Sequence, residues 1–395
     1  MYPDWPEHVP LQPQPRCIGP KLKPFDFQGP QKIEFLEYLG EGLHSHVVKV
    51  KVHGQIYALK LFKFCPDDDW MGPSGRNDSE DLLTMAAFSS FSEPFNAECR
   101  AYGRLEEAGH TELAIQCFGY VLLDEEHERI LLSQWEVLDI EYKLVGFLDM
   151  RARFKGKTKS GQPAPIRGIL KEFGQQNEDL RQGTARKILR DIVKLQQLGI
   201  IRLDVGHRQL INGKIADFST VITTPHYLTN QELRANLKPE GKAAVEFDSF
   251  RTSLYDYWGF EDMIAEWNDE HKDPKDQLSV YAFTRMWGRR PRYSLRSTPG
   301  RNRIYSLVDP RKHYDWKPSV LRELQNQGKS SGGLKSKSPP GDVSKTRRKL
   351  DAKPPRWYYD CDGAVSANLR GRTGWQRGML WTYKNDRFVP FRRAL

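Results

Sequence analysis

Four charged side chains have the types and the order along the chain that phosphoryl transfer needs. They are Lys60, Glu98, Asp204 and Asp217. A lysine held by a glutamate can contact the α- and β-phosphates of a nucleotide. One aspartate can then orient an acceptor hydroxyl, and a second can hold Mg²⁺ on the phosphates. Each residue alone is more often a turn residue or a solvated charge, so the ordered set carries the prediction.

Lys60 lies on the second strand of a predicted β-hairpin. Valines alternate with lysines over residues 48–52, and a second stretch, Ile56 to Phe62, follows the two-residue turn His53-Gly54. The period of two places Ala58 and Lys60 on one face of this strand. A lysine on an inner face needs a charged partner. The alternative is a lysine on an edge strand that faces water.

The hairpin is entered through a glycine-rich stretch, Leu39 to Val47, which fits G-x-G-x-x-G-x-V except for a serine in the third glycine position. Two glycines one residue apart are by themselves most often a turn. Followed by a strand that carries a lysine, the pattern predicts a loop over the phosphates of a nucleotide. The residues that we expect to contact this cofactor are Gly40, Gly42, Ser45, Val47, Ala58 and Lys60.

A helix that begins at Ser92-Glu93-Pro94 is expected to supply the partner of Lys60, because proline is favoured in a first helical turn. Glu98 lies on its apolar face, at helical spacing among Phe95, Tyr102 and Leu105. A solvated glutamate would not normally lie there. An ion pair between Lys60 and Glu98 explains both misplaced charges.

The two aspartates flank a second predicted hairpin. Asn212-Gly213 lies between two short apolar stretches and is a strong signal for a type I′ turn. Asp204 precedes this hairpin and Asp217 ends it, so we expect the two carboxylates near the same end of a small sheet.

Further elements are expected around these residues. Leu113 to Leu123 and Ile166 to Phe173 are predicted as strands. Thr184 is predicted to cap a helix that stops at Gly199. The sequence from Phe247 to Trp267 predicts an aromatic-rich helix in the core of a second lobe.

The motifs in this order resemble those of protein kinases. Tyr57-Ala58-Leu59-Lys60 resembles the V-A-I-K strand, and Glu98 resembles the glutamate that pairs with its lysine. Arg202-Leu203-Asp204 stands where H-R-D would stand, and Asp217-Phe218-Ser219 stands where D-F-G would stand.

Three short sequence segments resemble a fungal kinase-like family that is named for a subunit of the inner-kinetochore Sim complex. These segments are FNAECRAYGRL at residues 95–105, CFGY at 117–120 and TPH at 224–226. The resemblance implies protein partners in a nuclear assembly, at the kinetochore or on chromatin. It also implies an α+β, bilobal protein-kinase-like fold that binds ATP and Mg²⁺, with Lys60, Glu98 and Asp204 in catalytic roles.

Several positions depart from the kinase pattern in ways that matter chemically. Arg202 and Leu203 replace the histidine and arginine of H-R-D, which removes the usual anchor for an activation-loop phosphate. Gln209 replaces the metal-binding asparagine and offers the same amide oxygen on a longer arm, so the resemblance implies it as a ligand of Mg²⁺ beside Asp217. Ser45 and Ser219 replace glycines. No A-P-E segment is found. These changes argue against peptide phosphorylation, whereas nucleotide binding is compatible with them.

Charge divides the chain into an acidic body and a basic extension. Of 61 Lys+Arg and 51 Asp+Glu in 395 residues, 26 basic and 8 acidic residues fall in 288–395. Such asymmetry suggests a polyanionic partner, either nucleic acid or an acidic protein face. The alternative is a solvated tail. The predicted domain is 31–287, with lobes at about 31–175 and 176–287, after a Pro-rich segment 1–30.

Three segments of low regularity are also predicted. Residues 139–165 are polar and form an insertion in the first lobe, and 328–356 are expected to be disordered. A basic run at 345–349 is a candidate nuclear address. Residues 357–395 alternate aromatics with arginines, which favours docking on the body of the chain or on another protein over stacking on single-stranded bases.

Three functions therefore fit the sequence. The first is a kinase-like scaffold, nucleotide-binding or degenerate. The second is an atypical Mg-ATP-dependent phosphotransferase that uses Lys60, Asp204 and Asp217. The third is a nucleic-acid-associated protein that acts through its basic tail. Five scattered cysteines indicate neither a disulfide framework nor a zinc site, so a reducing compartment, nucleus or cytoplasm, is expected. No apolar run is long enough for a membrane helix.

Overall fold

The computed structural model describes residues 19–65, 90–135, 137–140, 151, 164–176, 179–230, 252–282 and 350, and the backbone of 293–294, 359–360, 375–376, 379–384 and 387–391. Residues 1–18, most of the insertion 139–165, the segment 328–356 with its basic run (except Leu350), and the side chains of 357–395 lie outside this description. The chain divides into two compact units. One holds Met1–Gln176, Lys214–Val221 and Ser319–Arg348, and the other holds Asn177–Gly213, Ile222–Pro318 and Lys349–Leu395.

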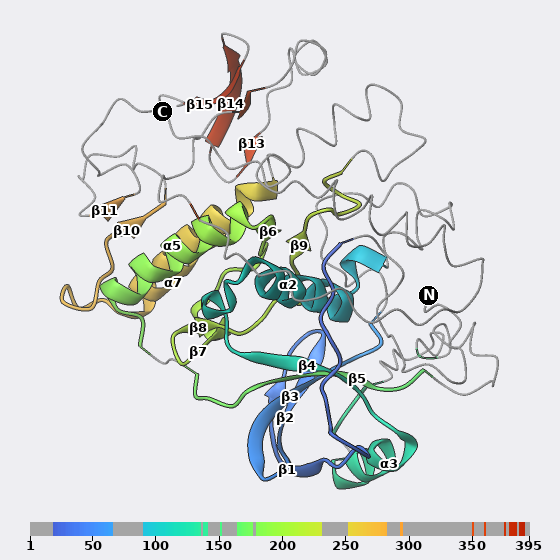
Figure 1. The fold of residues 1–395 in the computed structure, drawn as a ribbon. Coiled ribbons are helices and arrows are strands. Elements are labelled where there is room, and N and C mark those ends of the chain that lie inside the picture. The colour runs from blue at the N-terminus through green and yellow to red at the C-terminus, as the bar shows by residue number, and fades with distance from the viewer. Residues whose placement is uncertain are drawn as a thin grey trace, which may run out of the picture. The chain divides into compact units, whose positions relative to one another are not determined.

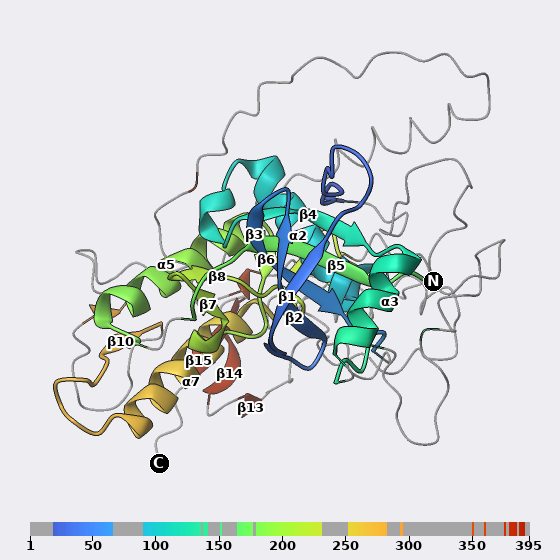
Figure 2. The ribbon, with the colours of Figure 1, turned by 90° about the horizontal axis from the view of Figure 1, so that it is seen from below.

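The first unit is built on a five-stranded antiparallel sheet with the order β1-β2-β3-β5-β4 (Figures 1 and 2). The strands are β1 (Glu34–Glu41), β2 (Ser45–Val52), β3 (Gln55–Phe62), β4 (Cys117–Leu122) and β5 (Arg167–Glu172). The predicted first hairpin is confirmed. His53 and Gly54 in its turn have φ values of +48° and +80°, and a type I′ turn requires positive φ at both positions.

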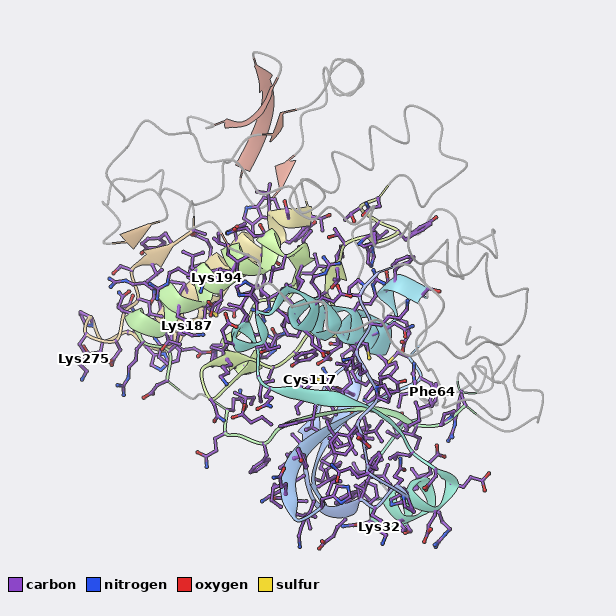
Figure 3. All side chains as sticks on the ribbon, viewed as in Figure 1. Lys32, Phe64, Cys117, Lys187, Lys194 and Lys275 are labelled. Atoms are coloured by element: carbon purple, nitrogen blue, oxygen red, sulfur yellow. The ribbon has the colours of Figure 1, made fainter. Side chains whose placement is uncertain are left out.

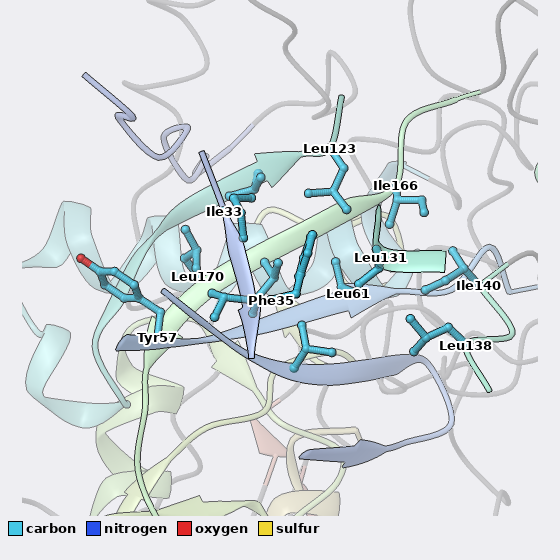
Figure 4. Close-up of a cluster of buried hydrophobic side chains, with 14 of the residues drawn as sticks. Ile33, Phe35, Tyr57, Leu61, Leu123, Leu131, Leu138, Ile140, Ile166 and Leu170 are labelled. Carbon is cyan, nitrogen blue, oxygen red and sulfur yellow. The ribbon is translucent and has the colours of Figure 1, made fainter. Parts of the chain in front are cut away.

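Strand β3 divides its side chains between two packed faces, as its period of two requires. Tyr57, Leu59 and Leu61 point into a hydrophobic core with Leu131 of α3 (Glu125–Gln134) and with Ile140 (Figure 4). On the other face, Phe62 packs against α2 (Pro94–Ala108), where its ring lies 5.4 Å from that of Phe95. The sheet therefore has a hydrophobic core on one face and α2 on the other.

Helix α2 begins as the sequence predicts. Glu93 is the N-cap, its carboxylate accepts a hydrogen bond from the backbone N–H of Asn96, and Pro94 occupies the first turn. Gly109 ends the helix at φ +68°, in the left-handed conformation that glycine adopts most easily. All but two of the residues of α2 are buried. A helix enclosed in this way is held from several sides.

One of the elements that enclose α2 is residues 19–25, which we call the N-terminal strap. A Cβ added to Gly103 of α2 would lie only 2.6 Å from the backbone of Lys21. The strap continues along the edge of the sheet, where Phe25 donates to the carbonyl of Tyr120 at 2.8 Å and Tyr120 donates to that of Lys23 at 3.1 Å. It therefore covers the outer edge of β4.

Two predicted boundaries were wrong. The strand predicted over Leu113 to Leu123 begins only at Cys117, because Thr111–Leu113 forms a short 3₁₀ turn, η3. The apolar residues at 113–115 are buried although they are not in a strand. The backbone N–H of Ile115 donates to the carbonyl of Ile215 at 2.7 Å. Helix α5 (Gln182–Gln197) starts before the predicted cap at Thr184. Its first helical hydrogen bond, Ala185 to Arg181, fixes the earlier start.

The second unit packs α5 against α7 (Tyr255–Glu270). This helix confirms the later part of the aromatic-rich helix predicted over 247–267, whereas residues 247–251 lie outside the described residues. Gly199 follows α5 at φ +75°, as its predicted role as a helix stop requires. A short sheet pairs β6 (Ile200–Ile201) with β9 (Ile222–Thr223). On α5, Lys187 and Lys194 both contact the carboxylate of Asp191, at 2.7 and 3.6 Å (Figure 3).

Several short strands are also present in the described residues. β7 (Leu210–Ile211) and β8 (Lys214–Ile215) flank a turn in which Asn212 and Gly213 have φ values of +51° and +70°, as the predicted type I′ turn requires. β10 (Val280–Tyr281) pairs with β11 (Tyr293–Ser294). The C-terminal backbone forms a sheet of the order β12-β15-β14-β13, from Tyr359–Asp360, Arg387–Phe391, Met379–Lys384 and Trp375–Gln376. Within the described residues, no helix has the length and apolar character to cross a membrane.

Candidate functional site

Four charged side chains of the first unit meet in the space between the sheet and α2, and we call them the charged cluster. They are Lys60 of β3, Glu98 of α2, Lys171 of β5, and Asp217, which follows β8. The Nζ atom of Lys60 lies 2.8 Å from Oε2 of Glu98 and 2.7 Å from Oδ1 of Asp217. The predicted ion pair between Lys60 and Glu98 is therefore confirmed, and one lysine joins both carboxylates.

Sequence reasoning missed Lys171, the second lysine of the cluster. Its ammonium contacts the other carboxylate oxygen of Glu98, Oε1, and donates to the carbonyl of Ala216 at 2.7 Å. Lys171 lies directly opposite Ala58 in the β3–β5 register, so the two side chains share one face of the sheet. A signal was available, because a period of two places Lys171 between Ile169 and Phe173 on one face of its strand.

The cluster is deeply buried on one side and accessible on the other. Glu98 has no exposed surface, and Lys60 and Lys171 are each 5% exposed, whereas the side chain of Asp217 is 36% exposed. Burial lowers the pKa of Lys171, and the attraction of Glu98 offsets this only in part. Burial acts likewise on Lys60, but Asp217 and Glu98 outweigh it and raise the pKa of Lys60.

Asp217 is held as an anion by its neighbours. Burial favours its neutral form, but the ammonium groups of Lys60 and Lys171 keep the pKa of Asp217 well below its ordinary range. The backbone N–H of Ser219 also donates to Oδ1 of Asp217, at 2.8 Å. The next side chain, Phe218, is fully buried, and its ring centroid lies 5.2 Å from that of Tyr102. This packing anchors the backbone that presents the carboxylate.

The glycine-rich stretch forms the tight turn between β1 and β2. Gly42 donates to the carbonyl of Ser45 at 2.8 Å, and Ser45 is buried at the start of β2. Gly40 has φ of +148°, a conformation that side-chain-bearing residues rarely adopt. Val47 lies directly opposite Lys60 in the β2–β3 register, so their side chains share a face. The predicted cofactor residues of β2 and β3 thus lie on the sheet face that carries the charged cluster.

The second unit contains the other two predicted site residues, Asp204 and Gln209, in contact with each other. Oδ2 of Asp204 accepts hydrogen bonds from Nε2 of Gln209 at 2.6 Å and from the guanidinium of Arg208 at 2.8 Å. The amide oxygen of Gln209, which we expected at a metal, accepts a hydrogen bond from the buried Arg202. Both polar ends of the Gln209 side chain are therefore engaged within the loop.

A buried aspartate of α7 supports this loop, and sequence reasoning did not identify it. Oδ1 of Asp256 accepts a hydrogen bond from the backbone N–H of Leu203 at 2.9 Å, and Oδ2 accepts one from Gln196 at 3.0 Å. Leu203 has φ of +63°, which is costly for a residue other than glycine. Burial raises the pKa of Asp256, although the hydrogen bond from Gln196 opposes the shift. Asp256 thus holds the strained backbone next to Asp204.

A divalent cation at Asp217 would depend on oxygens that its ligand brings. Within the described part of the chain, no group of three or more His, Cys, Asp or Glu side chains could hold a metal ion. Mg²⁺ commonly binds through one or two carboxylates together with substrate phosphates. The exposed carboxylate of Asp217 fits that kind of site, with Lys60 beside it for the phosphates.

Comparison with known proteins identifies one family. A scan against protein-family models matches residues 10–222 to the family described as kinetochore Sim4 complex subunit FTA2. The matched range includes Lys60, Glu98, Lys171, Asp204 and Asp217. A search of curated proteins finds no match.

Proposed function

Because the chain belongs to the FTA2 family of kinetochore Sim4 complex subunits, we propose that it is a kinase-like scaffold subunit of a kinetochore complex that binds a nucleotide at the charged cluster. The family supports the role of a kinetochore complex subunit, with protein partners and a place in the nucleus. The kinase-like character and the nucleotide are our inference from the site.

One observation carries the nucleotide-binding proposal: Lys60 is joined to both Glu98 and Asp217, at 2.8 and 2.7 Å. This arrangement presents a lysine for the α- and β-phosphates beside a carboxylate for a metal. Val47 and Ala58 share the face of Lys60 and would form the apolar surface for the base. ATP with Mg²⁺ is the ligand that this set of groups suits.

The loop around Asp204 supports a scaffold over an efficient enzyme. A catalytic base needs a carboxylate oxygen within reach of the acceptor hydroxyl, but Oδ2 of Asp204 already accepts hydrogen bonds from Arg208 and Gln209. The amide oxygen of Gln209 in turn accepts a hydrogen bond from Arg202. Use of Oδ2 as the base would require this network to rearrange, whereas nucleotide binding at Lys60 would not.

Thermal unfolding of the full chain, with and without ATP and Mg²⁺, tests this proposal. A ligand at about 100 times its Kd adds about 2.7 kcal/mol, which raises the midpoint of a domain of this size by roughly 5–10 °C at about 2–4 °C per kcal/mol. Lys60→Met should abolish the shift. The matched control is Lys51→Met, since Lys51 lies on the neighbouring strand and forms an exposed pair with Glu34. The absence of any shift at millimolar ATP would refute nucleotide binding.

An atypical phosphotransferase is the second candidate, because Lys60, Glu98, Asp204 and Asp217 are all present and Asp256 braces the loop of Asp204. Phosphotransfer that is unchanged by Asp204→Asn would exclude it. Nucleic-acid binding through residues 288–395 stays a prediction. It requires an affinity that falls steeply with salt and that is lost when this segment is deleted.

A further inference from the structure

The charged cluster contains one more cation than its proposed use with Mg-ATP needs. Lys60 and Lys171 contact the two oxygens of a single carboxylate, that of Glu98. Lys171 extends from the position opposite Ala58, on the face of the sheet that would receive the nucleotide. Its side chain therefore enters the same space as Lys60 from a different strand.

The formal charges of the cluster sum to zero. Lys60 and Lys171 balance Glu98 and Asp217, whereas the same cluster without Lys171 would carry a net negative charge. A negative site repels a polyphosphate, and a bound divalent cation usually supplies the compensating charge. Lys171 supplies a positive charge at the same place as a permanent part of the chain.

We propose that Lys171 takes over part of the role of the divalent cation, so that this site binds the polyphosphate of a nucleotide without requiring Mg²⁺. The inference rests on the proposed nucleotide-binding function and adds the ionic form of the ligand. The ligand class is a nucleoside polyphosphate anion, either free or as its metal complex.

Three features of Lys171 indicate that its positive charge would act on a polyphosphate bound at the charged cluster. Its Nζ atom lies 5.3 Å from the ring centroid of Tyr102, and an aromatic face favours a cation. Its other polar contact besides Glu98 is a neutral carbonyl, that of Ala216, so it adds charge without adding a second carboxylate. The charge of Lys171 also lowers the pKa of Asp217, and only the charge of Lys60 lowers it more. The electric field of Lys171 therefore reaches the exposed carboxylate of Asp217.

Binding of ATP to the full-length protein, measured by calorimetry in excess EDTA and in excess Mg²⁺, tests the proposal. For the wild type we expect Kd values within about tenfold of each other in the two conditions. Lys171→Met should weaken binding in EDTA by more than about tenfold, a loss of more than about 1.4 kcal/mol, and should weaken it less in Mg²⁺. Lys171→Arg keeps the charge and should behave like the wild type.

Each other outcome has a distinct meaning. Wild-type binding that occurs only with Mg²⁺ overturns the inference and leaves the proposed function intact. Tighter binding by Lys171→Met than by the wild type in EDTA also overturns it, because Lys171 would then obstruct the site. Failure of the wild type to bind in either condition overturns both the inference and the proposed nucleotide binding. If Lys171→Met does not fold, the EDTA and Mg²⁺ affinities of the wild type and of Lys171→Arg still decide.

Discussion

Replacing Glu98 by glutamine should destabilise the first unit strongly, because one carboxylate holds two buried lysines. Glu98 has no exposed surface, and its oxygens contact Lys60 and Lys171. In Glu98→Gln, Lys60 keeps its contact with Asp217, but Lys171 keeps only the carbonyl of Ala216. Two ammonium groups would then share one neutral amide in a buried space.

Removing one partner of a buried ion pair costs about 3–5 kcal/mol. At about 2–4 °C per kcal/mol, the unfolding midpoint should fall by roughly 6–20 °C. Lys171→Met alone should cost less, because burial already lowers the pKa of Lys171 and so disfavours its charge. The double variant, Glu98→Gln with Lys171→Met, should be more stable than the sum of the single effects implies, by about 1–3 kcal/mol.

Urea and thermal unfolding of the full chain and the three variants measure this double-mutant cycle. A matched control is Glu93→Gln, which removes a similarly buried carboxylate that pairs with Arg167 outside the cluster. Its cost should not change in the Lys171→Met background. If Glu98→Gln costs less than about 1 kcal/mol, or if the costs of the two changes simply add, the account of a shared carboxylate is refuted.

Three further substitutions test the contact of the strap with α2, the first turn of α5 and the charge of Asp217. Gly103→Ala should cost about 1–3 kcal/mol and should expose the strap to limited proteolysis, because its new Cβ would meet the backbone of Lys21 at 2.6 Å. Gly183→Ala, with nothing within 4 Å of its Cβ, should instead stabilise α5 by about 0.5–1 kcal/mol. Asp217 contributes stability above its unfolded pKa of 3.8 that is lost as the pH falls below it, because its folded pKa is lowered. Acid unfolding of Asp217→Asn should therefore be less steep below pH 4, and an unchanged acid limb would contradict the assignment.

Misplaced charges were the most informative feature of the sequence. Lys60 and Glu98 could be paired from sequence alone, because each lies on an apolar face where a single charge is too costly. The same rule applies to Lys171, but its partner could not be identified. Glu98 was already assigned to Lys60, and the register that places Lys171 opposite Ala58 is set by strand pairing across more than a hundred residues.

Contacts without a periodic pattern could not be predicted. Asp256 reaches the backbone of Leu203 across 53 residues, and a single side chain that supports a distant loop leaves no spacing to detect. The N-terminal strap is similar, since it meets β4 through a single isolated bridge, between Pro24 and Tyr120. Local signals for turns, by contrast, were reliable, although the cap signal at Thr184 was not. The turns at His53-Gly54 and Asn212-Gly213 have the positive φ values that their sequences favour.

The strap also limits how copies of this protein could associate. A sheet whose two outer strands are both unpaired can add further chains on each side and grow into a fibre. Within the described residues, the sheet ends at β1 on one side, while on the other side the strap occupies the edge of β4. Edge-to-edge pairing at β4 therefore requires the strap to leave its place. A chain shortened to begin after Phe25 would lack this cover, which favours pairing of β4 with another copy in any preparation of such a fragment.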